Sequence, residues 1–502
     1  MKKNFLYIGA AVLSMSLASC SEDFLEQTPT DVIAADDLAN AVNQDPSLLS
    51  GNVAGLYTTM INTQTGGTTG HDDFGQRGYD IYSDMLVGDM ALLGVNYGWY
   101  STIAQLTSPK DFTNNVNYTP WRYYYRVIFS ANTVIDALGG TDVTPSIASS
   151  RHIMGQAKAM RAYSYFYLAN LYAPKGYGTG SEKILPIYDN TVVPNQPLST
   201  SAEVYDLIIK DLKEAIVLLE DFNRTSKDQV NKYVAKGLLA YALSARGTQA
   251  DLEEVVTLTE DVLNNSGHTL TTPNQVVAKL DASGKLLNPE AGFNDVNTSS
   301  WIWGVDLTQE IGLNLVSWWG QVDVFTYSYA YVGDKKGMDK SLYDAIPASD
   351  IRKGQFEASD LTPRNKFFAP ARTIGGTRYA TMDYIYMRAD EMVLLNAEAN
   401  AKLNRDAQAR TSLKRLLDLR MDDASYINSL SGDALKNEIF KQTRIELWGE
   451  GKSYLSMKRN KLSVKRGNNH LYHKGVDFSY DADELTLEIP QAEVLNNPLL
   501  NQ

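Results

Sequence analysis

Residues 155–174 read GQAKAMRAYSYFYLANLYAP, and this stretch indicates what kind of fold the chain adopts. Small and large apolar residues recur in it at the spacing of one helix face: Ala162, Phe166, Ala169 and Ala173. Tyrosines and leucines fill most of the remaining circumference, and a helix that is apolar nearly all round is normally buried on several sides. Pro174 cannot continue the helix. A row of tyrosines can also serve as a ligand platform, so packing and binding are both open at this point.

A second stretch, residues 231–247, repeats this arrangement. Its Ala235, Leu239 and Ala242 have the same small–large–small spacing. On the second helix of a pair this spacing is the tetratricopeptide pattern, in which small residues let neighbouring helices approach and the large residue fills the gap. We therefore expect a mainly α fold, a tetratricopeptide-like helix-pair scaffold, with the helix of residues 155–174 packed inside it.

Local signals predict where several elements begin and end. Thr200 and Glu203 form a capping-box pattern. Thr119 and Pro120 predict the start of a helix, because proline is favoured at the first helical position. Residues 485–489 alternate like a short strand. Helical periodicity also occurs in three segments of the second half, residues 387–403, 406–419 and 435–448.

The segment from about 268 to 384 has a different character. Gly, Asn, Asp and Pro are frequent in it, aromatic residues are crowded, and no long helical periodicity persists. Irregular segments of this length in a compact protein are usually functional. We expect a loop-rich, ligand-facing segment with little β structure, placed between two parts of the helical scaffold, about 33–267 and about 385–460.

Composition and charge exclude some classes of protein. The 502 residues have a formal net charge of -13 and no basic stripe, so nucleic-acid binding is not expected. The single cysteine excludes an intrachain disulfide and a thiolate metal cluster. No metalloprotease motif or nucleophile elbow surrounds any of the five histidines. The sequence predicts no catalytic residue, no metal site and no cofactor.

The N-terminus has the three-part form of a secretory signal: two lysines, an apolar run and small residues. We expect residues 1–19 to be a signal peptide. Residues 17–20, Leu-Ala-Ser-Cys, resemble a bacterial lipobox, and the only cysteine of the chain stands where that motif needs it. Acylation of Cys20 would anchor the protein in a membrane. Residues 20–32 would then form a lipidated N-terminus and tether leading into the domain.

Several stretches along the chain carry a family resemblance: Cys20-Ser21-Glu22-Asp23, Ala159-Met160-Arg161-Ala162-Tyr163, Met387-Arg388-Ala389-Asp390-Glu391, Arg444-Ile445-Glu446-Leu447 and Ile489-Pro490-Gln491. In this order they resemble the SusD/RagB family, the outer-membrane nutrient-binding lipoproteins of Bacteroidetes. The resemblance implies one SusD-like domain over residues 33–502, with four tetratricopeptide-like helix pairs. It also implies lipid anchoring at the outer membrane, facing the cell surface, and a TonB-dependent SusC-like transporter as partner.

Loop aromatic residues are the candidate ligand contacts. Sugars present C–H faces that lie well on tyrosine and tryptophan rings, whose polar tips can bind hydroxyls. An aromatic residue in a loop is a better candidate than one on a helix. In the loop of residues 95–118 we therefore single out Tyr97, Trp99 and Tyr100, with Asn96 as their hydrogen-bonding neighbour.

The remaining candidates come from other loops. The family resemblance implies aromatic residues on loops from both halves of the chain, and on that basis Trp318 and Trp319 would form the opposing wall. Asp73 and Arg77, in or beside the Gly-rich residues 65–78, are polar candidates.

The sequence and the resemblance together indicate a lipoprotein that captures extracellular oligosaccharide and delivers it to the transporter, over which it sits as a lid. Three alternatives stay open. The same scaffold could bind peptides, or the chain could be a lipid-anchored glycoside hydrolase, which needs two carboxylates at a set separation across a cleft. If the aromatic residues are buried, it could be a scaffold without a ligand.

Overall fold

The computed structural model describes residues 46–173, 178 and 180–500. The predicted signal peptide, Cys20 and the tether of residues 20–32 lie outside the described residues. Within the described part, no helix is both long enough and apolar enough to cross a membrane.

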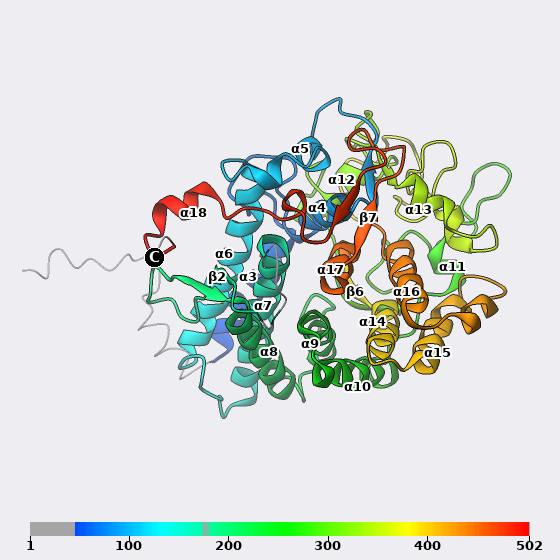
Figure 1. Ribbon diagram of the computed structural model, residues 1–502. Coiled ribbons are helices and arrows are strands. Elements are labelled where there is room, and N and C mark those ends of the chain that lie inside the picture. Colours follow the sequence, from blue (N-terminus) through cyan, green and yellow to red (C-terminus); the bar gives the residue numbers. More distant parts are fainter. Residues whose placement is uncertain (1–45, 174–177, 179, 501–502) are drawn as a thin grey trace, which may run out of the picture.

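Helices dominate the structure (Figure 1). The first half contains α3 (Ser50–Ile61), α4 (Gln76–Val87), α5 (Ser101–Ala104), α6 (Asn115–Ala137), α7 (Ala148–Tyr172), α8 (Ser201–Leu218), α9 (Lys232–Arg246) and α10 (Gln249–Asn265). The helices that follow are α11 (Pro273–Val276), α12 (Trp318–Val322), α13 (Lys340–Asp344), α14 (Ala389–Lys402), α15 (Asp406–Leu417), α16 (Gly432–Glu446), α17 (Lys452–Asn460) and α18 (Gln491–Asn496). The 3-10 helices are η2 (Pro46–Leu49), η3 (Ser108–Lys110), η4 (Gln309–Ile311), η5 (Ile351–Gln355), η6 (Ser425–Ser429) and η7 (Asp483–Leu485).

The described strands form four antiparallel pairs, each of two short strands. These are β1 (Met90–Leu92) with β5 (Lys336–Met338), β2 (Lys183–Pro186) with β3 (Leu198–Thr200), β4 (Trp301–Val305) with β6 (Tyr384–Arg388), and β7 (Ser463–Lys465) with β8 (Asp477–Ser479). The β1–β5 and β4–β6 pairs matter most for the site, because they tie the irregular segment to parts of the chain that are distant in sequence.

The long helices pack in sequence order. Helix α6 lies against α7, α7 against α8, α8 against α9 and α9 against α10, and α10 then packs on α14, as Figure 1 shows from the cyan to the yellow part of the chain. The residues of the small–large–small pattern on α7 and α9 are all buried. The Phe166 ring of α7 lies 6.3 Å from the Tyr241 ring of α9. The tyrosines of α7 are buried as well, so the helix packs inside the scaffold and presents no ligand surface.

The structure differs from the sequence prediction at two places, the start of α6 and the strand expected at residues 485–489. Helix α6 begins at Asn115, before Thr119, because the Asn114 side chain accepts a hydrogen bond from the Val116 amide and caps the extra turn. Pro120 therefore lies inside the helix. Residues 485–489 form no strand: Leu485 ends η7, Thr486 between the two leucines is buried as well, and the Leu487 amide donates to the Leu171 carbonyl. The capping box at Thr200 and Glu203 is confirmed.

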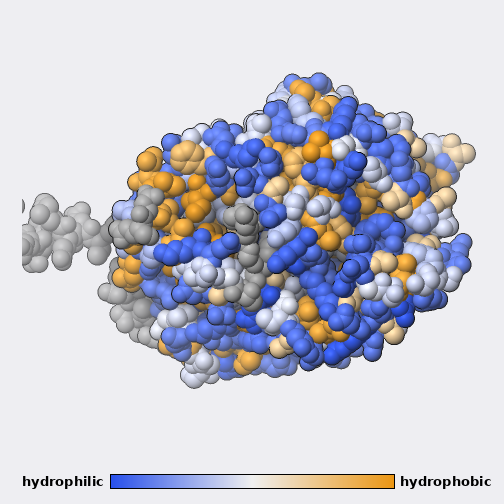
Figure 2. Space-filling view, in the orientation of Figure 1, coloured by the Kyte–Doolittle hydropathy of each residue, from blue (hydrophilic) through white to orange (hydrophobic). Residues whose placement is uncertain are grey.

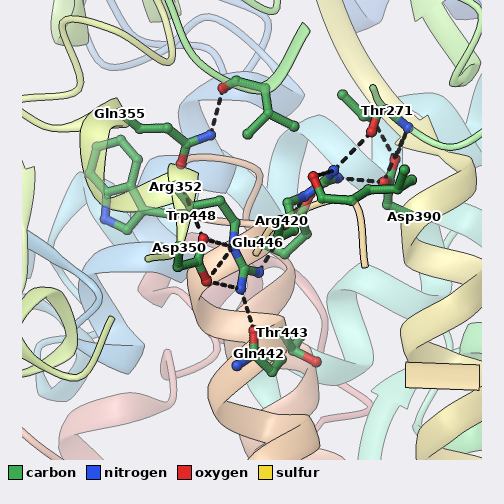
Figure 3. Close-up of polar contacts among 12 residues, drawn as sticks. Thr271, Asp350, Arg352, Gln355, Asp390, Arg420, Gln442, Thr443, Glu446 and Trp448 are labelled. Atoms are coloured by element: carbon green, nitrogen blue, oxygen red, sulfur yellow. Dashed lines mark hydrogen bonds and ion pairs between the residues drawn. The ribbon is translucent and has the colours of Figure 1, made fainter. Parts of the chain in front are cut away.

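A buried network of ion pairs attaches the irregular segment to the helices of the second half (Figure 3). At its centre the Glu446 carboxylate pairs with three guanidinium groups, those of Arg352 at 3.0 Å, Arg388 at 2.8 Å and Arg420 at 2.8 Å. Arg420 also pairs with Asp390 at 2.8 Å. Burial opposes the charge of Glu446, but Arg420 and Arg388 outweigh it and hold the pKa of Glu446 well below its usual range. The network fixes residues from η5, β6, α14 and α16 against one another.

This network explains what two of the family-like stretches do. Arg388 and Asp390 come from the stretch of residues 387–391, and Glu446 comes from residues 444–447. Arg444, from the second stretch, pairs with the buried Asp89 at 2.7 Å. These charged residues are inside the protein and hold the fold together, so they are not ligand contacts.

Candidate functional site

The candidate site lies where the β1–β5 pair opens into two loops. After β1 the chain passes through residues 93–100, and before β5 it passes through residues 327–335. The buried Asp334 carboxylate accepts hydrogen bonds from three successive backbone amides of the first loop, those of Asn96, Tyr97 and Gly98. The Asn96 side chain bonds in turn to the Val332 carbonyl. The two loops are therefore held together by one carboxylate and one amide.

Four rings meet above this junction, and we call them the aromatic cluster: His71, Tyr97, Trp99 and Tyr329. The His71 and Trp99 rings are stacked, with centroids 5.1 Å apart and an angle of 6° between their planes. Tyr329 packs edge-on against Tyr97 at 5.2 Å and against Trp99 at 6.1 Å. Three loops that are far apart in sequence thus contribute to one surface.

The rings of the aromatic cluster differ in exposure. Tyr97 is 65% exposed, Trp99 is half-buried and Tyr329 is 7% exposed. Tyr329 also bonds through its hydroxyl to Nδ1 of His71. Burial lowers the pKa of His71, so its ring is neutral at neutral pH and Nδ1 can accept that hydrogen bond. Tyr329 is therefore the support, and Tyr97 with Trp99 provides the ring surface that a ligand can reach.

A buried lysine underlies the aromatic cluster. Lys336 donates from Nζ to the backbone and side-chain oxygens of Gln321, both at 3.1 Å. The Gln321 side-chain amide then donates to the His71 carbonyl at 2.9 Å. Burial lowers the pKa of Lys336 to about 7, against the opposing effect of Asp334. This chain of hydrogen bonds fixes the loop that carries His71.

Asp73, Arg77 and Tyr100 do not reach the surface, and each is buried in a structural role. The Asp73 carboxylate accepts from the backbone amides of residues 66 and 68 and so shapes its own Gly-rich loop. Arg77 lies in α4, where it pairs with Asp80 at 2.7 Å and donates to the Gly449 carbonyl at 3.0 Å. Tyr100 precedes α5 with a φ of 66° and packs edge-on against a tyrosine of α4. The prediction that these three contact ligand is corrected accordingly.

Trp318 and Trp319 are also buried, with 0% and 1% of their surface exposed. The Trp318 ring lies 4.6 Å from the ring of Phe367. The Arg77 guanidinium lies 4.8 Å from the centre of the Trp318 ring. Both tryptophans belong to the short helix α12, and the Arg77 side chain of α4 packs over the Trp318 ring. They cannot form the opposing wall. In the structure the irregular segment contributes Tyr329 instead, which packs against the rings of Tyr97 and Trp99 as their support.

Sequence reasoning missed His71, Tyr329 and Asp334 as parts of the site. Nothing in the local sequence distinguishes Tyr329 from its neighbours Tyr327 and Tyr331, which are both exposed. The Arg378 guanidinium lies 4.8 Å from the Tyr327 ring centre.

An arrangement of this kind suits a ligand with flat apolar faces and polar edges. Stacked and edge-on rings offer several faces, and tyrosine hydroxyls at the rim can bond to a ligand's hydroxyl groups. The carboxylates of Asp73 and Asp334, which lie in the loops of the site, accept hydrogen bonds from backbone amides.

Comparison with known proteins identifies related chains. A family model described as starch-binding and associating with the outer membrane matches residues 69–246, and one described as the SusD family matches residues 325–502. A SusD-like protein of Bacteroides ovatus is 28% identical over 281 residues, which are 54% of this chain but only about half, 46%, of that relative's length.

Two solved structures are similar in fold. A SusD-like carbohydrate binding protein from Bacteroides vulgatus has a TM-score of 0.72 and 22% sequence identity, over 90% of this chain and 97% of that chain. A crystal structure determined with a xylogluco-oligosaccharide has a TM-score of 0.60 and 17% identity, over 90% of this chain and 98% of that chain.

Proposed function

Because the chain belongs to the SusD/RagB family, we propose that it binds extracellular glycan and that the sugar stacks on the aromatic cluster. The observation that carries the proposal is the stacked His71–Trp99 pair beside the exposed Tyr97 ring. A platform of this kind matches the C–H face of a sugar ring. The descriptions of the two similar structures, one as carbohydrate binding and one with a xylogluco-oligosaccharide, support the same class of ligand.

The rigidity of the platform supports a binding role. The Asp334 carboxylate fixes the backbone of the Tyr97 loop, and the Tyr329 hydroxyl and Gln321 amide fix His71 on either side. A site whose rings are already held in place loses less conformational entropy when it binds.

The place of the protein in uptake is a further part of the proposal. An acylated Cys20 anchors the chain in the outer membrane, and the bound oligosaccharide is delivered to a TonB-dependent SusC-like transporter, over which the protein sits as a lid. The family description, association with the outer membrane, supports the location. Replacement Cys20→Ala is expected to release the protein from the outer-membrane fraction. Retention of that variant in the membrane would contradict the anchor.

Glycan binding is tested by titrating the full-length protein, purified in detergent, with a panel of neutral and acidic oligosaccharides in a calorimeter. Trp99→Ala and Tyr97→Ala are expected to weaken binding by about tenfold or more, since a few buried aromatic contacts dominate such interfaces. Tyr426→Ala, which removes a partly exposed ring elsewhere, is the matched control and should bind as the wild type does. No response to any glycan, with binding to a peptide library, would overturn the glycan assignment in favour of peptides.

We also propose that binding occurs without catalysis. Chromatography of each binding oligosaccharide after prolonged incubation with the protein is expected to return it intact. Shortened products that vanish on heat denaturation of the protein would instead indicate a hydrolase.

A further inference from the structure

A second aromatic surface lies along α6, and in the described part of the chain its rings pack on one another and on Tyr165, Tyr172 and Tyr188 rather than on the aromatic cluster. Its residues recur at helical spacing on one face of the helix: Tyr118, Trp121, Tyr125 and Phe129. Helix α18 and the stretch of residues 188–194 flank this face, and we call the space between them the α6 groove. Figure 2 shows apolar residues gathered around α18 and α6 on the left of the view.

The α6 groove contains two hollows of about 420 and 390 Å³. Both are lined by Tyr125, Phe129 and Glu493, so they are parts of one continuous depression. Each hollow has the size of a small-ligand site, for which about 300–1,000 Å³ is usual. A ligand longer than one ring could therefore occupy both.

The rings of the α6 groove are held in place by hydrogen bonds. The Tyr125 hydroxyl donates to the Pro186 carbonyl at 2.9 Å, and the Trp121 indole donates to the Glu493 carboxylate at 3.3 Å. Phe129 differs because it has no polar atom and is 60% exposed. Exposed apolar patches beside a hollow often mark a binding site.

Two arginines one helical turn apart border the rings. Arg122 donates to the Tyr118 hydroxyl at 2.7 Å, and Arg126 donates to the Thr65 carbonyl at 2.8 Å. Neither guanidinium forms an ion pair with an acid in the described part of the chain. Glu493, the carboxylate that lines the groove, already accepts from Trp121 and from Asn497 at 3.1 Å. The charged side chains that line the groove are therefore two arginines and one glutamate. They give a local excess of one positive charge in a chain whose net charge is -13.

We propose that the α6 groove is a second carbohydrate site and that it takes an acidic oligosaccharide, one that carries uronic-acid carboxylates. This rests on the proposed function as a glycan binder. The rings of Tyr118, Tyr125 and Phe129 receive sugar faces beside the buried Trp121 ring. The guanidinium groups of Arg122 and Arg126 receive carboxylates, for which arginine has matching geometry. Two side chains that water can reach and that can bond to hydroxyl groups, Ser130 and Asn496, line the groove as well. That mixture favours a sugar over a purely apolar protein surface.

The test uses the full-length protein in detergent with tetragalacturonate, tetramannuronate and a neutral galactotetraose. At least one of the two uronates is expected to bind, and the neutral sugar is expected to leave the α6 groove empty. Phe129→Ala and Arg126→Gln should each weaken uronate binding by about tenfold. Both residues are exposed, so the variants should fold, and glutamine keeps a donor for the Thr65 carbonyl. Uronate binding should also weaken as salt is added.

Trp99→Ala separates this proposal from the proposed function. Uronate binding that depends on Phe129 and survives Trp99→Ala supports the second site, even if no neutral glycan binds to the aromatic cluster. Uronate binding that is lost in Trp99→Ala and unchanged in Phe129→Ala overturns the second site and leaves the proposed function standing. If neither uronate binds, the proposal of a second site is overturned as well. Equal affinity for hexaglutamate, with the same dependence on Phe129, would assign the groove to an acidic peptide instead.

Discussion

Asp334 is expected to be the residue on which the order of the candidate site depends. Its carboxylate accepts four hydrogen bonds from three successive amides, with the two to Tyr97 at 3.1 and 3.0 Å and the one to Gly98 at 3.1 Å. The replacement Asp334→Asn keeps the shape of the side chain, removes the charge and turns one acceptor into a donor. One amide hydrogen of the loop then faces an N–H group inside the protein.

The size of the destabilisation expected for Asp334→Asn follows from the hydrogen bonds that its carboxylate accepts. A hydrogen bond to a charged group contributes about 1.5–3 kcal/mol, and a buried donor left without a partner costs about 1–3 kcal/mol. The lost bond and the unpaired donor are the same event and are not added, so this event and the weakening of the bonds that remain give a local destabilisation of about 2–4 kcal/mol. Because the loop of residues 93–100 carries both Tyr97 and Trp99, the affinity for glycan should fall when the loop is destabilised.

Hydrogen exchange measured by mass spectrometry on peptides covering residues 93–100 is the direct assay. Exchange of the amides of residues 96–98 should speed up in Asp334→Asn by about 30-fold to several hundredfold, as each 1.4 kcal/mol is tenfold. Asp281→Asn is a matched control, since Asp281 accepts two backbone amides in an exposed turn elsewhere. Unchanged exchange at residues 96–98, together with unchanged glycan affinity, would refute the reasoning.

Other changes test the scaffold. Phe166→Ala should lower the free energy of unfolding by about 3–5 kcal/mol through a core cavity, as measured in urea; native stability with lost glycan binding would contradict a packing role. Glu446→Gln leaves three buried guanidinium groups without their common carboxylate and should lower the free energy of unfolding by about 3–5 kcal/mol. A decrease below about 1 kcal/mol, the scale of a surface ion pair, would show that the network is weak. Burial, reinforced by Asp89 and Asp80, raises the pKa of the Asp84 carboxyl well above its usual range. The folded state therefore keeps this proton at a pH where the unfolded chain has lost it. As a result the free energy of unfolding of the wild type falls as pH rises above about 4. The unfolding free energy of Asp84→Asn, measured from pH 4 to 8, should therefore gain on the wild type as pH rises; a constant difference would contradict the shift.

The helical scaffold could be predicted because its signals are local. The small–large–small spacing on α7 and α9 and the capping box at Thr200 depend on residues within one or two turns, and the structure agrees with them. The start of α6 was placed wrongly because two local signals compete there. Proline at position 120 is compatible with a helix start, and the cap at Asn114 is stronger.

The candidate site could be predicted only in part, because burial of a loop residue depends on partners far along the chain. Trp99 and Trp318 both stand in irregular segments with similar neighbours, and nothing local separates them. Trp318 is covered by Phe367 and Arg77, whereas Trp99 is covered on one side by His71 and stays half-buried. The contacts of Tyr97 and Trp99 with ligand stay predictions. Asp334 could not be recognised because its role is defined by amides of a distant loop.

The position of Glu446 has a consequence for the response of the protein to ionic strength. Dissolved ions screen charges that water can reach, and they act much less on pairs from which water is excluded. An exposed pair such as Lys210 and Asp142 is open to that screening, whereas the three guanidinium groups around Glu446 are not. The attachment of the irregular segment to the helices should therefore be indifferent to salt. The loops of the irregular segment should then keep the same geometry in dilute and in concentrated media.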